Sequence, residues 1–170
     1  IKNIGSAGLA RSKVYVIKVI EAILLMLICS IISFVIVILL GGLILEIKDM
    51  AYFRQLVGMC ISRSSAIIFL WISQITLVML LYLLIKNSGV ISFTYILLLT
   101  MLGNVLALCG KHIDPIFIKM YEYLPNTIIK AIIKAEEISN GELVKCALIG
   151  ITYTVILTGI GISVLKRKDL

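Results

Sequence analysis

Residues 22–45 have the sequence AILLMLICSIISFVIVILLGGLIL, without a single charged residue. Three further apolar runs follow at 66–85, 90–109 and 147–165. Each run is about 19 to 24 residues long, which at 1.5 Å per residue matches a hydrocarbon core of about 30 Å. Lipid cannot hydrogen-bond to the backbone N–H and C=O groups, so a spanning segment has to be a helix or part of a closed barrel. The runs are too long and continuous for the alternating strands of a barrel. The sequence therefore predicts an all-α membrane protein, a single domain over residues 1–170 with a bundle of four spanning helices.

The composition and the charge agree with a membrane protein. Hydrophobic residues make up 61% of the chain, well above the roughly 45–50% apolar content of soluble domains. The net charge is +7, from 16 Lys and Arg against 9 Asp and Glu. Basic residues near the membrane surface are attracted to anionic lipids by about 1 kcal/mol each, and no soluble module is long enough to carry a basic binding face. We therefore expect contact with membrane lipids and no nucleic-acid binding.

Basic residues flank the apolar runs unevenly. Four of them precede the first run: Lys2, Arg11, Lys13 and Lys18. Lys86 separates the second run from the third, and residues 166–168 follow the last run with three more. These segments share one side if four helices alternate, and basic loops tend to stay in the cytoplasm. We therefore expect a multi-pass protein of the cell membrane with a cytoplasmic segment at 1–21 and both termini cytoplasmic.

Residues 110–145, between the third and fourth runs, are too long for a simple turn and too apolar for a disordered loop. We expect an outer helical hairpin over 113–141, in which Asp114-Pro115 starts a helix over 116–124 and Pro125 restarts a second one. Residues 139–141, Ser-Asn-Gly, are expected to end that second helix. Tyr123 and Pro125 are the candidate residues of this hairpin, which either dips into the bundle or caps the outer surface.

Residues for catalysis or metal binding are sparse. His112 is the single histidine, whereas a catalytic metal site usually needs three protein ligands. Glu136-Glu137 is similar to the glutamate pair of some intramembrane proteases, but Gly141 stands where their arginine is expected. A disulfide between Cys109 and Cys146, at the outer helix ends, is geometrically conceivable, although no paired spacing supports it. We expect no enzyme activity, no metal and no cofactor in this chain.

Polar residues inside the apolar runs are the remaining candidates, because each is destabilising in hydrocarbon unless it finds a partner or a pathway. Gln74 lies near mid-membrane, and Asn104 lies nearer the outer end. They contact either a substrate path or another helix, and we favour the helix contact, which typically contributes about 0.6–2 kcal/mol. In the last run a face of small residues predicts a close helix approach, within the chain or in a dimer, at Gly150, Thr154, Thr158 and Gly161.

Three short motifs occur in order along the chain. The first is Gly8-Leu9-Ala10-Arg11-Ser12, followed by Lys18 and a spanning helix. The second is Tyr123-Leu124-Pro125 before the last helix, and the third is the ending Leu165-Lys166-Arg167-Lys168-Asp169-Leu170. In order and spacing they resemble the cytoplasmic stretch, the last extracytoplasmic re-entrant hairpin and the basic-then-aspartate ending of type-2 ABC exporter permeases. That family has six spanning helices, so four are expected of a chain that lacks the first two.

This resemblance implies the transmembrane subunit of an ATP-driven exporter, moving an amphipathic cargo such as a peptide antibiotic, a drug or a lipid-like molecule. It implies a dimer with a second permease copy or homologue, and a cytoplasmic ATPase subunit that holds the ATP and magnesium. It also implies that Gly8, Arg11, Ser12 and Lys13 dock on that ATPase. The alternative is a non-transporting membrane immunity or assembly factor that scaffolds a partner.

Overall fold

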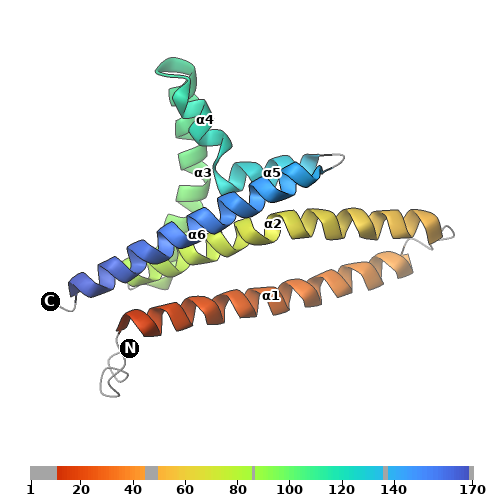
Figure 1. The fold of residues 1–170 in the computed structure, drawn as a ribbon, viewed down its shortest axis with the longest axis horizontal. Coiled ribbons are helices and arrows are strands. Elements are labelled where there is room, and N and C mark those ends of the chain that lie inside the picture. The colour runs from red at the N-terminus through yellow and green to blue at the C-terminus, as the bar shows by residue number, and fades with distance from the viewer. Residues whose placement is uncertain (1–10, 45–49, 86, 136–137, 169–170) are drawn as a thin grey trace.

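The computed structural model describes residues 11–44, 50–85, 87–135 and 138–168, which contain helices and no strands. The helices of this described part are α1 (Arg11–Ile44), α2 (Met50–Leu84), α3 (Ser88–His112), α4 (Ile116–Glu122), α5 (Pro125–Lys134) and α6 (Asn140–Lys168) (Figure 1). Four of them, α1, α2, α3 and α6, are long and apolar enough to cross a membrane. The chain is therefore an all-α, multi-pass membrane protein, as the sequence predicts.

The apolar runs mark only parts of the long helices. α1 begins at Arg11, inside the segment expected to precede the first span, and α2 begins at Met50 although its apolar run starts at 66. With 34 and 35 residues, α1 and α2 are each about 50 Å long, whereas a hydrocarbon core is about 30 Å thick. Both helices therefore extend past the hydrocarbon on at least one side.

α2 and α6 form the most extensive helix contact and run in the same direction (Figure 1). They meet closely where Gly150 of α6 lies against Phe69 of α2. α1 runs antiparallel to both, and Tyr15 near its start packs against Gly161 near the end of α6. Because α2 and α6 are parallel, the chain has to return from the end of one to the start of the other. α3, α4 and α5 lie on this return.

The buried core lies where α2, α5 and α6 meet. Its buried members are Ala66, Ile67, Leu70, Ile132 and Cys146. At the edge of this core, Nη2 of Arg63 donates a hydrogen bond of 2.6 Å to the carbonyl oxygen of Ala135, which follows the last turn of α5. A cation at the carboxyl end of a helix satisfies a free carbonyl and is favoured by the helix dipole. α5 is thus attached to α2 by both apolar packing and a charged hydrogen bond.

The hairpin begins as its sequence predicts. Oδ1 of Asp114 accepts a hydrogen bond of 2.8 Å from the amide of Ile116, the first residue of α4. α5 starts with Pro125, which fits the first helical turn because no amide hydrogen is needed there. The first hairpin helix ends at Glu122, two residues earlier than expected, and the chain turns before α5.

The predicted end of the second hairpin helix at 139–141 is wrong. α5 already ends at Lys134, and α6 begins at Asn140. Ser139 and Glu142 form a capping box at this start: the Glu142 carboxylate accepts a 2.8 Å bond from the Ser139 amide, and Oγ of Ser139 accepts a 3.3 Å bond from the Glu142 amide. These two bonds satisfy amides that the helix itself cannot, so the segment starts a helix.

α3 and α4 project away from the layer that α1, α2 and α6 form (Figure 1). α4 folds back on α3, where Gly110 leaves room for Ile118 and Gly103 leaves room for Tyr121. A Cβ at position 110 would stand 3.0 Å from the backbone nitrogen of Ile118, so the approach requires a glycine. Apart from these two glycines, only Ile91 is buried in α3. Most of the α3 surface is therefore open.

Candidate functional site

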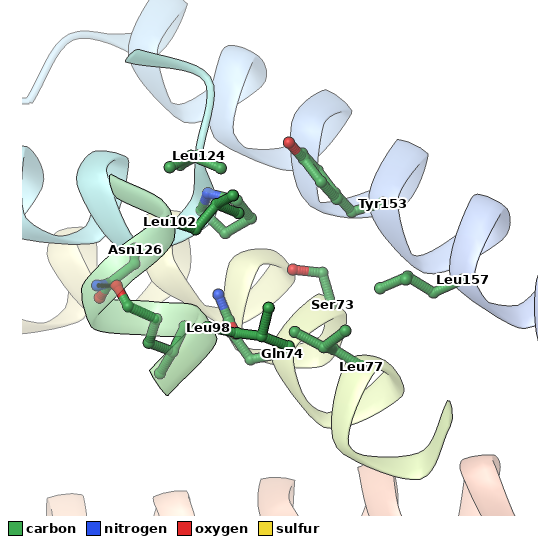
Figure 2. Close-up of a pocket in the computed structure, with 11 residues that line it drawn as sticks. Ser73, Gln74, Leu77, Leu98, Leu102, Leu124, Asn126, Tyr153 and Leu157 are labelled. Carbon is green, nitrogen blue, oxygen red and sulfur yellow. Dashed lines mark hydrogen bonds between the residues drawn. The ribbon is translucent and has the colours of Figure 1, made fainter. Parts of the chain in front are cut away.

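A cavity of about 180 Å³ lies between α2, α3, the start of α5 and α6 (Figure 2). Its walls are mainly leucine, and its polar lining consists of Ser73, Gln74, Asn126 and Tyr153. A larger groove of about 780 Å³ between α1 and α2 is lined by no amide and no charged side chain. Small-molecule sites are usually apolar with a few converging polar groups, so the smaller cavity is the candidate functional site.

Gln74 reaches this cavity from α2. The hydroxyl of Tyr95 on α3 donates a hydrogen bond of 3.3 Å to Oε1 of Gln74, which joins the two helices. A side-chain amide has two donor hydrogens and two acceptor lone pairs, so this single bond leaves capacity for another polar group. Gln74 therefore takes part in helix packing and also presents a polar group to the cavity.

Asn126 faces the same cavity from the second position of α5. Its Nδ2 donates a hydrogen bond of 3.3 Å to the backbone oxygen of Leu99 on α3. Pro125, directly before it, is buried and also lines the cavity. Two amides from distant parts of the chain, Gln74 and Asn126, thus line one cavity. Asn126 lies outside the apolar runs, and no periodicity in the sequence points to its place in the same cavity as Gln74.

Tyr153 and Leu157 of α6 lie across the cavity from Ser73 and Leu77 of α2 (Figure 2). The Ser73 hydroxyl donates a 2.6 Å bond to the Leu70 carbonyl oxygen in its own helix, so it is already satisfied. The half-buried Tyr153 makes no hydrogen bond through its hydroxyl to any described residue. The α6 side of the cavity therefore has a hydroxyl that a ligand or water can bind.

Asn104, which the sequence groups with Gln74, does not line this cavity. It is exposed on α3, whereas the cavity is lined from α3 by Leu98, Leu99 and Leu102. The structure therefore separates the two amides. Gln74 faces other helices of the same chain, and Asn104 faces outward.

The two hairpin residues have different surroundings. Pro125 is buried at the cavity, and Tyr123 is exposed. The ammonium group of Lys145, on α6, lies 5.3 Å from the centre of the Tyr123 ring. Such an exposed cation–π contact contributes about 0.5–1 kcal/mol. It connects the turn between α4 and α5 to the first turns of α6.

The segment expected to dock on an ATPase is described only in part. Gly8 lies outside the described residues. Arg11 is the first residue of α1, Ser12 is half-buried and Lys13 is exposed. Lys18 pairs with Glu21 at 2.6 Å on the exposed side of α1. Within this described stretch, Lys13 is an exposed cation, and it lies at the end of the fold where the last turns of α6 also lie.

The small-residue face of α6 contacts two other helices of the chain. Gly150 lies against Phe69 of α2, and Thr154 donates a 2.8 Å bond to the Gly150 carbonyl oxygen. Gly161 lies against Tyr15 of α1, whose ring atoms would stand 2.5–2.6 Å from a Cβ at that position. The Tyr15 hydroxyl is buried there with no hydrogen-bond partner among the described residues. Thr158 lies half-buried between these two contacts.

The cysteines and the histidine are dispersed. Cys109 and Cys146 are both free in this structure, and Cys146 belongs to the buried core. His112 is exposed at the end of α3. Among the described residues, no three His, Cys, Asp or Glu side chains come close enough together to hold a metal ion.

Comparisons with known proteins return no relative. No protein-family model, no curated protein and no solved structure matches the chain. A function therefore has to be inferred from the fold, the cavity and the sequence motifs.

Proposed function

We propose that this chain is the transmembrane permease subunit of an ATP-driven ABC exporter in the cell membrane, with both termini cytoplasmic. The observation that supports this proposal most is the packing of the hairpin. α5 returns from α4 to pack against α2 and α6, and its first residues, Pro125 and Asn126, line the cavity. A hairpin that re-enters the helix bundle before the last span is what the sequence resemblance implies for such permeases.

The lining of the cavity supports an amphipathic cargo. Leucine side chains offer apolar contact, while two amides and a tyrosine hydroxyl offer hydrogen bonds, and no lining residue is charged. The cavity holds about 180 Å³, less than the roughly 300–1,000 Å³ of typical ligand sites. Transport of a whole drug, lipid or peptide therefore requires a second conformation in which the cavity is larger, and cargo binding would favour that conformation.

ATP and magnesium belong, in this proposal, to a separate cytoplasmic ATPase subunit. Arg11 and Lys13, at the start of α1, are the proposed contacts, together with Gly8 and Ser12. A second permease copy or homologue completes the complex. Opposite charges across such an interface speed association and fix its orientation, and like charges placed there weaken it.

Co-purification tests the proposal. The full-length protein is purified with the ATPase encoded beside its gene, as wild type and as the double variant Arg11→Glu, Lys13→Glu. We expect wild type to retain the ATPase and the variant to bind it at least roughly tenfold more weakly. The matched control is Lys130→Glu, Lys134→Glu, two exposed cations on α5 at the opposite end of α6, which should bind the ATPase normally.

Each outcome decides between the two functions. If folded wild-type protein retains no ATPase, the exporter proposal fails and a membrane immunity or assembly factor becomes the better explanation. If the control variant on α5 loses the ATPase as completely as the variant at the start of α1, the docking segment is wrongly placed.

A further inference from the structure

Two further hollows adjoin the candidate cavity. A pocket of about 300 Å³ lies between α1, α2, α3 and α5, and we name it the middle pocket. It shares Gln74, Leu99 and Asn126 with the cavity. It also shares Met26 and Trp71 with the groove of about 780 Å³ between α1 and α2. The middle pocket therefore adjoins both the cavity and the groove.

The middle pocket contains polar groups with spare hydrogen-bonding capacity. Gln74 accepts one bond from Tyr95, and Asn126 donates one bond to the Leu99 carbonyl oxygen. The side-chain nitrogen of Gln74, the side-chain oxygen of Asn126 and the indole nitrogen of Trp71 form no hydrogen bond with any described residue. Together they offer donors and an acceptor, and a polar group without a partner is destabilising in hydrocarbon. The middle pocket therefore suits a polar group that both donates and accepts hydrogen bonds.

The described residues that line the three hollows carry no charge. No Asp, Glu, Lys, Arg or His is among those that line the middle pocket, the cavity or the groove. A charged group without a counter-charge is strongly destabilised inside a membrane. The polar group that fits the middle pocket is therefore an uncharged one, such as a hydroxyl or an amide.

The groove suits an alkyl chain. It is bounded by residues 26–34 of α1 and 61–71 of α2, which extend about 12 Å and 15 Å along their helix axes. Its lining is apolar except for serines, whose hydroxyls can bond back to their own helix. Ser65 does so, with a 2.8 Å bond to the Ser62 carbonyl oxygen. The groove therefore offers mainly apolar contact, and it adjoins the middle pocket at Trp71.

We propose that the groove and the middle pocket together form a binding site for an amphiphile with an uncharged polar head and an alkyl tail. The head hydrogen-bonds to Gln74 and Asn126 in the middle pocket, and the tail lies along the groove, with Trp71 where the two parts meet. For the exporter proposed above, the site narrows the cargo to neutral lipid-like molecules and excludes cationic peptides. Only this identification as cargo rests on the proposed function. Binding itself needs no ATPase, so the two proposals can fail separately.

Trp71, the single tryptophan of the chain, reports on this site directly. The full-length protein, with Trp71 as its only tryptophan, is reconstituted in phosphatidylcholine vesicles. A monoacylglycerol with a brominated chain is then titrated in, because bromine quenches tryptophan fluorescence on contact. We expect quenching that saturates while the probe is still a minor part of the lipid, and that unbrominated monoacylglycerol reverses. The control probes carry the same brominated chain on a sulfate or a trimethylammonium head, and they should quench only in proportion to their concentration.

Three results of this titration overturn the proposal. Quenching that never saturates, or that unbrominated monoacylglycerol does not reverse, would mean that Trp71 only contacts bulk lipid. Equal or tighter binding of a charged probe would mean that the site does not select an uncharged head. No quenching by any probe would mean that another segment of the full-length chain, a second copy or a different protein fills the groove.

Two variants locate the head of the amphiphile. Gln74→Leu and Asn126→Leu should each raise the apparent dissociation constant of the neutral probe roughly 2- to 10-fold, the range expected for one hydrogen bond, and reduce its preference over the charged probes. Asn104→Leu is the matched control, because Asn104 is an exposed amide of α3 that lines none of the three hollows. Circular dichroism and a monodisperse elution profile confirm the fold of each variant. Binding by both head variants as tight as that of wild type overturns the inference.

Ser30→Phe locates the tail, because it places an aromatic ring in the groove. It should weaken binding of the neutral probe severalfold and leave the preference for an uncharged head unchanged. Ser163→Phe is the matched control, since Ser163 is an exposed serine of α6 outside the groove. Equal binding by these two variants would place the tail outside the groove and overturn the proposal.

Discussion

Replacing Gly150 with alanine should weaken the contact between α2 and α6. A Cβ at position 150 would overlap the carbonyl carbon and oxygen of Phe69 and stand 2.8 Å from the Phe69 Cβ. The first two are backbone atoms that cannot rotate away, so the two helices would have to separate. Overpacking of this kind costs about 1–3 kcal/mol, against which alanine gains about 0.5–1 kcal/mol from its better helix propensity.

Gly159→Ala is the matched control for this substitution. Gly159 lies on the same helix, and nothing stands within 4 Å of the Cβ that alanine would add. Both variants gain the same helix propensity, so the difference between their free energies of unfolding isolates the overpacking. We expect Gly150→Ala to be less stable than Gly159→Ala by about 1–3 kcal/mol.

The assay is unfolding of the purified protein in mixed micelles by titration with dodecyl sulfate, followed by the fluorescence of Trp71, the single tryptophan of the chain. Retained helix content and a monodisperse elution profile confirm that both variants start folded. If Gly150→Ala is as stable as Gly159→Ala, the close approach of α2 and α6 at Phe69 is wrong.

Two further substitutions test the attachment of the hairpin and the start of α6. Arg63→Gln removes the charged hydrogen bond of 2.6 Å to the Ala135 carbonyl oxygen. Because such hydrogen bonds contribute about 1.5–3 kcal/mol, amide hydrogen exchange in α5 should become faster by roughly tenfold or more. The exposed Arg54 gives the control Arg54→Gln, and equal exchange rates in the two variants would contradict the attachment. Ser139→Ala removes one half of the capping box with Glu142 and should destabilise the first turn of α6 by about 0.5–2 kcal/mol. The loss should be visible as faster amide hydrogen exchange at residues 140–143, and unchanged exchange rates there would refute the capping box.

The spanning helices could be predicted from the sequence because lipid imposes one simple requirement on a spanning segment. A run such as 22–45 has to be apolar and has to satisfy its backbone internally, and both conditions are local. The starts of α4 and α5 are local as well, since Asp114 and Pro125 act on the turn in which they stand. The segment 139–141 was misassigned because Ser, Asn and Gly occur at both ends of helices. Glu142, three residues after Ser139, was the signal that distinguishes a start.

The candidate site was only partly predictable. Gln74 stands out because an amide within an apolar run requires a partner. Its neighbours, Tyr95 on α3 and Asn126 on α5, depend on which helices pack together. A helix that is apolar all round has no distinct face, so its sequence carries little information about its neighbours. The small-residue face that contains Gly150 and Gly161 was visible in the sequence. The sequence does not show, however, that these two glycines contact different helices.

The length of α2 has a mechanical consequence. It is one unbroken helix of 35 residues, and Arg63, which holds the end of α5, lies about 30 Å along its axis from Leu84. A rigid rod of that length, pivoting by roughly 10° at the Leu84 end, displaces the Arg63 end by roughly 5 Å. α5 would be carried with it, and Pro125 and Asn126 form part of the cavity wall. A small tilt of α2 at its Leu84 end would therefore change the shape of a cavity that lies about halfway along its apolar run.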